Sequence, residues 1–454
     1  MAFDPDESPA KPSRLIIPGA EREPVEKPRI ILPPGSSLET HDDLPEYPRL
    51  RGVQLTPVRD GDRELLLVTD PLGITPGQPV LGFETIAILQ LLDGATSMTD
   101  IQALVMQESK DLRVGNIVRE FIAKLDDLLL LHSPKFEAAL ARAQAEWHPL
   151  EVRPAALEGI CYPAERAALE KFLDEQFAIA ADRAQEAGEP PAAAKTLPRA
   201  LLAPHLDPRR EGPVAARAYL ELGAGAAPGA TLRVVVFGTG HQLGEDFVAL
   251  TRKRFETPQG TVPGDTAFVD KVAAKLGDAA YRRELVHRDE HSIEFQLLYL
   301  QRRLGRRFTL VPILCGAFHR LLDDHKPPRD EPVIETLIDA VRGAEQELGG
   351  PTLYVAGVDF SHVGPRFGDP KLDAEASELV RKTDELAIGA AATGDADEWF
   401  RAIAEVDDAT RICGFAPVYC MLRAASPGPG RPLMYAESPE PDGSVVTVAA
   451  MVWP

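Results

Sequence analysis

The spacing of apolar residues changes along this chain and divides it into parts. From residue 151 onward, short apolar runs at 200–203, 233–237, 308–314, 352–358 and 445–450 alternate with longer segments. Those segments show helical spacing at 164–178, 212–222, 266–276, 291–304, 331–348, 371–391 and 414–424. Several of the strand-like runs are apolar on both faces, which is typical of a buried, mostly parallel sheet. We therefore predict an α/β domain over 151–454, with a mostly parallel central sheet flanked by helices.

Residues 49–132 show a different pattern. Two short strands, 53–58 and 65–70, lie on either side of an Asp-Gly-Asp turn. Three segments with apolar residues at helical spacing follow. They are 83–92, a second segment that Thr99 would cap, and 114–131. The pattern predicts a small β-β-α-α-α module of about 85 residues, near the lower size limit for independent folding.

The two remaining segments are connecting or leading parts of the chain. Residues 1–48 contain ten prolines and only short apolar pieces. Such a segment cannot bury enough surface to offset the entropy of ordering it, so we expect a disordered or extended lead. Residues 133–150 read as a helical linker that ends at Trp147-His148-Pro149.

Composition narrows the classes of function. Acidic residues outnumber basic ones by 70 to 49, which gives a net charge of −21. Nucleic acids and anionic membranes require clustered Lys and Arg, so neither is expected as the main partner. The start of the chain has no basic, apolar secretory pattern, and no apolar run reaches the length of about 18 residues that a membrane helix needs. The four cysteines form no CxxC pair, which favours the reducing cytoplasm.

Three histidines follow three of the predicted strands. They are His205, His241 and His362, the last in the run Asp359-Phe360-Ser361-His362. Ligands of such sheets bind beyond the carboxyl ends of the strands. A single histidine there is more often a hydrogen-bonded loop residue. The position that all three share favours one common site.

Cys413 precedes an apolar helix, whose N-terminal dipole favours the thiolate form that binds metals. A plain buried cysteine is the alternative, and it suits Cys315 and Cys420 better. Two imidazoles and a thiolate would make an open mononuclear site for iron(II), copper or zinc. Asp359 and His362 would then support the ligands, add a fourth ligand or carry protons.

His291 lies in the run Asp289-Glu290-His291-Ser292-Ile293-Glu294, which reads as the start of a helix. We take it as a candidate proton donor or substrate-binding group. Glu290 and Glu294 share a helix face and could act as an acid/base pair. Acidic residues in a first turn are more often simple partners of the helix dipole.

These segments, in their order, resemble the Memo family, also called AmmeMemoRadiSam system protein B. The resemblance covers roughly residues 157–450 and rests on Ala203-Pro204-His205, Gly238-Thr239-Gly240-His241, Asp289–Glu294, Asp359–His362 and Ile412-Cys413-Gly414. It implies a fold similar to class III extradiol dioxygenases and a metal held by His205, His241 and Cys413. It also implies supporting or catalytic roles for His291, Asp359 and His362. Further implications are a radical SAM protein and an AMMECR-type protein as partners.

Three segments depart from the family pattern. Leu157–Tyr162 stands where the family has a pattern close to His-Ala-Gly-Ser-Trp-Tyr. Leu206-Asp207-Pro208 follows the first metal histidine in place of the family's Ala-Gly-Tyr, and Gln242 replaces the second histidine of a pair. The implied metal set is preserved, whereas the substrate preference need not follow the family.

Residues 49–132 resemble the PqqD-like winged-helix modules of modified-peptide pathways. The cues are Thr69-Asp70-Pro71, Ile88–Gly94 and Phe121–Leu125. The resemblance implies that a peptide could bind by adding a strand to the edge of the module's sheet.

Three functional hypotheses follow. The first is a redox protein that uses oxygen or another oxidant at an open His/His/Cys site, with iron as the preferred metal and copper next. The second is a binding adaptor that holds peptides at the same cleft and at the front module without turnover. The third is a zinc hydrolase that uses the same ligands.

Overall fold

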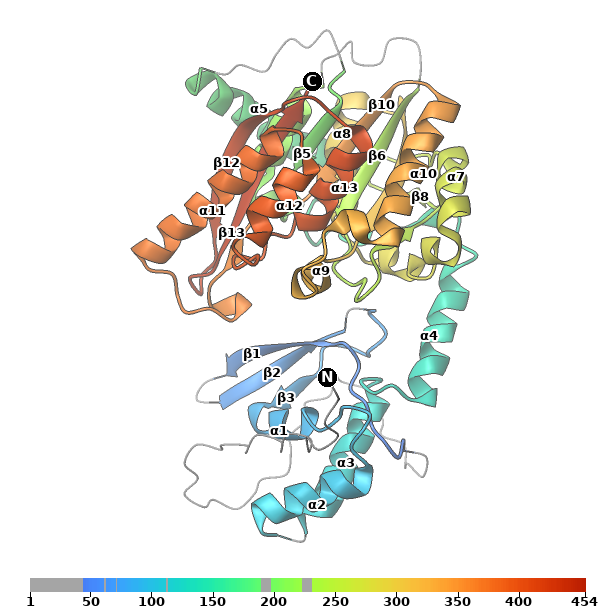
Figure 1. Cartoon of the computed structure of the whole chain (residues 1–454), viewed down its shortest axis with the longest axis vertical. Helices are drawn as coiled ribbons and strands as arrows, with labels where there is room; N and C mark the ends of the chain where they lie inside the picture. The colour runs from blue at the N-terminus through green and yellow to red at the C-terminus, as the bar shows by residue number, and fades with distance from the viewer. Residues whose placement is uncertain (1–43, 61–62, 71, 112, 189–196, 223–230) are drawn as a thin grey trace, which may run out of the picture.

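The computed structural model describes residues 44–60, 63–70, 72–111, 113–188, 197–222 and 231–454. The predicted lead, 1–48, lies outside the described residues as far as residue 43. The described chain forms two units, a small N-terminal module and a larger α/β domain, joined by the helix α4, Pro134–Trp147 (Figure 1). Among the described residues, none of the helices has the length and apolar character that a membrane crossing requires.

The α/β domain is built on an eight-stranded sheet with the order β11-β13-β5-β10-β6-β9-β7, in which β12 also pairs with β13. Four adjacent strands are parallel: β5 (Ala200–Ala203), β10 (Thr352–Gly357), β6 (Leu232–Thr239) and β9 (Phe308–Cys315). The antiparallel strands at the two sides are β13 (Val445–Trp453), β12 (Arg431–Pro439), β11 (His362–Val363) and β7 (Val248–Leu250). The mostly parallel sheet confirms the predicted fold class.

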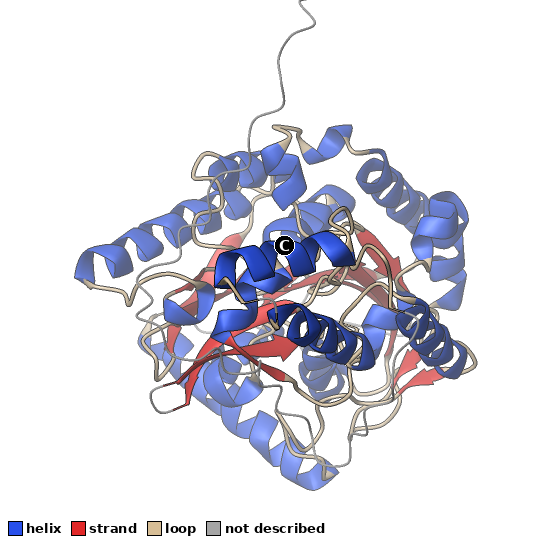
Figure 2. Ribbon diagram, turned by 90° about the horizontal axis from the view of Figure 1, so that it is seen from below, coloured by secondary structure: helices blue, strands red, loops and turns tan. Residues whose placement is uncertain are grey.

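The sheet is covered by helices on both faces (Figure 2), and its strands contribute alternate residues to two apolar cores. In β5, Ala200 and Leu202 pack into one core while Leu201 and Ala203 pack into the other. The first core includes α7 (Thr266–Leu276), α10 (Pro332–Leu348), α11 (Ala374–Ala392), α12 (Ala396–Ala404) and α13 (Phe415–Ala425). The second includes α5 (Arg166–Glu186), α6 (Pro208–Leu220) and α8 (Glu294–Leu304). Burial on both faces explains why the strands read as continuous apolar runs.

Some elements of the domain differ from the sequence prediction. Strand β12 and helix α12 were not predicted, and in β12 only Leu433 and Ser438 are buried and several side chains are polar. The short strands β4 (Val152–Arg153) and β8 (Arg254–Phe255), the short helix α9 (His319–Asp323) and the 3-10 turn η3 (Glu284–Arg288) were also not predicted. The predicted helix 291–304 begins only at Glu294, so His291 lies in the turn before it.

The N-terminal module has a three-stranded antiparallel sheet in place of the predicted pair of strands. Its strands are β1 (Gln54–Asp60), β2 (Arg63–Thr69) and the short β3 (Val80–Gly82), and its helices are α1 (Ile86–Leu89), α2 (Met98–Ser109) and α3 (Val114–Asp127). Thr99 as the cap of the second helix is wrong: the Oγ of Ser97 accepts the N–H of Asp100. The winged-helix assignment and peptide binding by this module stay predictions.

Helix α4 occupies the predicted helical linker, and an aromatic residue at each of its ends is buried. At the N-terminal end, the Arg51 guanidinium lies 4.1 Å from the ring centre of Phe136. At the other end, Lys253 lies 4.8 Å from the ring centre of Trp147 and donates a hydrogen bond of 2.6 Å to the carbonyl of Leu150. Both ends of α4 are therefore tied to the unit that each one meets.

The fully buried ion pair of Arg153 and Glu294 supports the chain segment that leads into α8. The Glu294 carboxylate also accepts the Tyr162 hydroxyl and the N–H groups of Ala156 and Leu157. Arg153 donates further hydrogen bonds to the carbonyls of His287 and Glu290.

We expect Glu294→Ala to lower the free energy of unfolding by about 3–5 kcal/mol, because it leaves the Arg153 charge buried and uncompensated. Urea denaturation of the full chain measures this loss. Glu170→Ala is the matched control, since Glu170 forms an exposed i,i+4 pair with Arg166 that contributes only about 0.3–0.5 kcal/mol. Equal losses in the two variants would contradict the expectation.

Candidate metal centre

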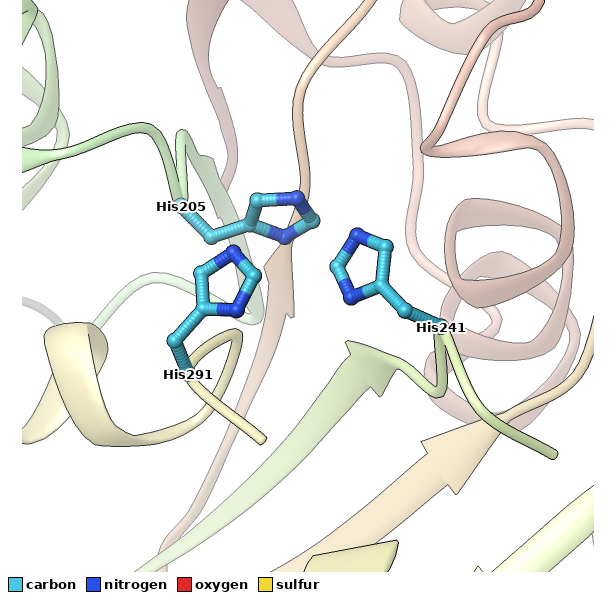
Figure 3. A group of neighbouring side chains, drawn as sticks. All are labelled: His205, His241 and His291. Carbon is cyan, nitrogen blue, oxygen red and sulfur yellow. The ribbon is translucent and has the colours of Figure 1, made fainter. Parts of the chain in front are cut away.

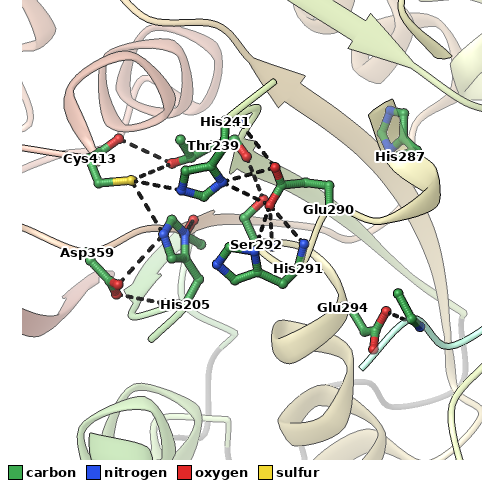
Figure 4. A network of polar contacts seen from close by, with 12 residues as sticks. His205, Thr239, His241, His287, Glu290, His291, Ser292, Glu294, Asp359 and Cys413 are labelled. Carbon is green, nitrogen blue, oxygen red and sulfur yellow. Dashed lines mark hydrogen bonds and ion pairs between the residues drawn. The ribbon is translucent and has the colours of Figure 1, made fainter. Parts of the chain in front are cut away.

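The candidate metal centre lies where the parallel strands end. His205 follows β5, Thr239 ends β6 with His241 two residues on, and Asp359 follows β10. Because β10 lies between β5 and β6 in the sheet, the residues after these strands come together although they are far apart in sequence. Cys413 joins them from the turn before α13, and His291 from the turn before α8 (Figures 3 and 4).

His205 is buried and held in one orientation. Its Nδ1 lies 2.8 Å from the carbonyl oxygen of Gly357, which can only accept a hydrogen bond, so Nδ1 carries the proton. The other ring nitrogen, Nε2, is then directed toward the centre, 3.4 Å from the Sγ of Cys413. Asp359 fixes the backbone here, because its Oδ1 accepts the N–H groups of His205 (2.9 Å) and Leu206 (3.0 Å). Its Oδ2 lies 3.7 Å from Nε2 of His205.

His241 is oriented by a carboxylate. Its Nδ1 lies 3.1 and 3.0 Å from the two oxygens of Glu290, and its Nε2 lies 3.4 Å from the Sγ of Cys413. A carboxylate on one ring nitrogen fixes the tautomer and makes the other nitrogen a better metal ligand. Glu290 therefore does more than act as a partner of the helix dipole, which was the role favoured from sequence.

His291 belongs to the same cluster. Its ring stacks on that of His241, with centroids 4.8 Å apart and planes 12° apart, and it meets the ring of His205 edge-on at 5.1 Å. One ligand atom from each of these three histidines lies within 4.8 Å of the others (Figure 3).

The distances to Cys413 suit one shared ion. Typical bond lengths from sulfur and nitrogen to a tetrahedral metal place two such ligands about 3.6 Å apart. The observed separations from Sγ to the Nε2 atoms of His205 and His241 are both 3.4 Å. One thiolate and at least two imidazoles fit iron, copper or zinc by donor chemistry.

Close backbone packing places the turn that carries His291 over the strand ends. A Cβ on Gly357 would lie 2.5 Å from the carbonyl oxygen of Ser292, and one on Gly238 would lie 2.5 Å from the Ser292 Oγ. Ser292 also donates from Oγ to the carbonyl of Thr239. Glycine at both strand ends is therefore required for the turn to approach the centre.

The electrostatics favour a thiolate paired with imidazolium groups when no metal is bound. Burial alone would raise the pKa of Cys413, but the charges and hydrogen bonds of His205 and His241 lower that pKa well below its usual value. Burial alone would lower the pKa of His205, but Asp359 and Cys413 raise it to about 9. The pKa of His241 is likewise raised well above its usual value by Glu290 and Cys413, against the effect of burial.

His291 differs from the other two histidines in its charge. Burial lowers its pKa to about 3, and the charges of His241 and His205 act in the same direction, against Glu290. Its imidazole is therefore neutral at neutral pH. A neutral imidazole suits a ligand or a proton acceptor better than the proton donor expected from sequence.

His362 lies apart from these contacts. It is on β11, where its Nδ1 lies 2.9 Å from the Phe360 carbonyl and its ring meets Phe367 edge-on. Within the described chain, none of its hydrogen bonds, ion pairs or ring contacts reaches the cluster. Cys315 and Cys420 are buried, as the sequence reading expected.

The N-terminal module touches the segment that carries His291. The Arg288 guanidinium donates to the carbonyl oxygens of Leu72 (2.7 Å) and Gly73 (3.4 Å) of the module. In Figure 1 the module's sheet lies next to the end of the domain opposite the C-terminus, and β5 runs antiparallel to the C-terminal strand, so it points toward the module. The sequence carried no signal of this contact.

Comparisons with known proteins agree with the motif resemblance. A family model described as "Memo-like protein" matches residues 153–452. A MEMO1 family protein of Aquifex aeolicus is 25% identical over 324 residues, covering 71% of this chain and 77% of that protein. A MEMO1 family protein of Methanopyrus kandleri is 32% identical over 240 residues (52% and 78%), and one of Methanosarcina acetivorans is 29% identical over 309 residues (67% and 99%). The matched family region begins after the N-terminal module.

We expect Cys413→Ala to weaken binding of iron(II) and copper(I) by more than about 100-fold, since even the loss of an outer hydrogen-bond partner costs about 10–100-fold. Anaerobic titration with a competing chelator measures the dissociation constants. Cys161→Ala is the control, because Cys161 is half-buried in a separate turn. Unchanged binding by Cys413→Ala would mean that the site is misassigned.

We also expect metal affinity to rise with pH. His205, with its pKa raised to about 9, and His241 carry protons at neutral pH that a metal must displace. The apparent affinity should increase by about tenfold per pH unit for each proton released. Cobalt(II) titrations in buffers from neutral pH to about 9 measure this slope, and an affinity independent of pH would contradict it.

Proposed function

The chain belongs to the Memo-like protein family, and from this premise we propose that it is a metal-dependent redox protein whose centre is formed by His205, His241 and Cys413. The observation that carries the proposal is the equal distance of 3.4 Å from the Cys413 Sγ to the Nε2 atoms of two oriented histidines. The proposal places iron first, copper second and zinc last. A bound iron or copper ion would supply electron transfer or oxygen activation at this site.

The protein's own residues would hold and tune such an ion. Gly357 and Glu290 fix the ring orientations of His205 and His241 through their Nδ1 atoms. Cys413 would stand in the position that a carboxylate occupies in the extradiol dioxygenases, to which the sequence motifs imply a similar fold. Thiolate is a softer and stronger donor than carboxylate, which shifts the potential of the metal, so the proposal does not include ring cleavage.

An acidic side chain and a hydroxyl would also support the ligands. Asp359 holds the backbone of His205 and presents Oδ2 near its Nε2, where it can take up a proton that the histidine releases. Thr239 donates from Oγ1 to the Cys413 carbonyl, and the same oxygen lies 3.5 Å from Sγ, so it limits the positions the sulfur can take. A role for His362 in proton transfer stays a prediction, because its position beside Phe367 gives it no contact with the ligands.

A binding adaptor is the second candidate function, and one observation favours it. The module contacts the segment next to the centre through Arg288, so a peptide held on the module would lie near the cluster. Peptide binding without turnover would use the same surfaces. The zinc hydrolase ranks last because the resemblance to dioxygenases favours redox metals. A radical SAM protein and an AMMECR-type protein remain the proposed partners on the ground of family resemblance.

We expect protein loaded anaerobically with iron(II) to consume oxygen in the presence of a catechol or a thiol, and Cys413→Ala to lose this activity. An oxygen electrode measures uptake, and elemental analysis gives the metal in the purified protein. Cys161→Ala should behave like the wild type. Stoichiometric zinc without oxygen uptake would favour the hydrolase, and tight peptide binding without uptake would favour the adaptor.

A further inference from the structure

The turn before α8 places His291 beside the proposed metal centre. The inference drawn from this position rests on the proposed function and concerns the number of metal ligands. We propose that His291 is a third imidazole ligand, so that the protein offers four donors to one ion: His205, His241, His291 and Cys413. The observation behind it is that one ring nitrogen of His291 lies within 4.8 Å of a ring nitrogen of both His205 and His241.

Glu290 contacts both histidines, and it accepts a hydrogen bond from the ring of His241. One of its oxygens lies 3.2 Å from Nδ1 of His291, and both lie within 3.1 Å of Nδ1 of His241. The same carboxylate accepts the backbone N–H groups of His241, His291 and Ser292, at 3.1, 2.8 and 2.9 Å. A carboxylate on Nδ1 is the usual outer partner of a metal-binding histidine, and it leaves Nε2 as the free donor. Figure 4 shows the Glu290 carboxylate beside the rings of His241 and His291.

The distances allow a common ion. One ligand atom from each of His205, His241 and His291 lies within 4.8 Å of the others. Two nitrogens on one ion are about 3.4 Å apart in tetrahedral geometry and about 4.2 Å apart when opposite each other. Even the widest pair among these three nitrogens would therefore need to approach by no more than about 1.4 Å.

The backbone that carries His291 is fixed from two sides. Arg153, which is fully buried, donates to the carbonyls of His287 and Glu290. The Gln296 amide donates to the Pro204 carbonyl at 3.0 Å and to the Ser292 carbonyl at 3.2 Å. Gln296 therefore ties the residue before His205 to the residue after His291, which sets the separation of the two histidines.

A fourth protein donor has a chemical consequence. Three protein ligands leave an open position for water or substrate, whereas four complete a tetrahedral shell. An external ligand must then add as a fifth donor or displace one of the four. Removal of His291 should weaken metal binding and at the same time make the ion more accessible to small ligands, a combination that a purely structural role would not produce.

Cobalt(II) in the full-length chain tests the proposal, because its visible spectrum reports donor number and type. We expect His291→Ala to shift the ligand-field bands, to weaken cobalt(II) binding by at least about 10–100-fold, and to bind azide more tightly than the wild type. Added imidazole should restore the wild-type spectrum. His325→Ala is the control, because this histidine is exposed on the surface, and it should leave spectrum and affinity unchanged.

The outcomes separate the two proposals. Wild-type protein that binds neither cobalt(II) nor iron(II) would overturn the metal centre itself. Wild-type protein that binds metal, with a His291→Ala spectrum and affinity equal to the wild type, would overturn only the role of His291. X-ray absorption of the wild-type cobalt protein needs no variant: three imidazoles and one sulfur support the proposal, and two imidazoles with one sulfur overturn it. His291→Gln replaces the alanine variant if the latter does not fold.

Discussion

The parallel alignment of β5, β10 and β6 is the constraint on which the rest of the site depends. In a parallel sheet every strand delivers its following residue to the same edge. His205, Asp359 and the segment from Thr239 to His241 therefore meet although about half of the domain separates β5 from β10 in the chain. The helices on both faces keep this alignment, since adjacent residues of each strand anchor opposite cores. No loop has to fold into a special shape to gather these groups.

Contacts at the Nδ1 atoms orient the histidine rings, so the side chains at the strand ends form a defined set of metal donors. Two histidines of the cluster have a hydrogen-bond acceptor at Nδ1, a backbone carbonyl for His205 and the Glu290 carboxylate for His241, and Nδ1 of His291 lies 3.2 Å from the same carboxylate. The buried negative charges of Glu290 and Asp359 also raise the pKa values of His241 and His205 and so favour the thiolate form of Cys413. The negative charges of Glu290, Asp359 and the Cys413 thiolate would therefore offset the positive charge of a bound metal ion.

The N-terminal module adds a feature that the metal centre alone does not explain. Helix α4 is fixed to both units by its end residues, and Arg288 reaches from the centre's own segment to the carbonyls of Leu72 and Gly73. The loop that offers these carbonyls is itself held by Asp70, which accepts the N–H groups of Leu72, Ile74 and Thr75 and pairs with Arg51. A module held in this way near the centre can restrict what reaches it.

The sequence by itself determined the fold class and the family, and it singled out most of the side chains that meet at the candidate metal centre, because strand burial and strand-end histidines are local signals. It predicted helix 266–276 to the residue and the strands β5, β6, β9 and β10 to within a few residues. It did not show β12 or β3, whose mixed or short patterns carry little periodicity, and it missed α12 although Ala396, Trp399 and Ile403 lie at helical spacing. Only the tertiary structure decided how the donors combine: that Glu290 serves two histidines, that His291 joins the cluster while His362 stays outside it, and that the module contacts the segment beside the site. These depend on distances between segments far apart in the chain, and such distances are set by packing, which local pattern does not encode.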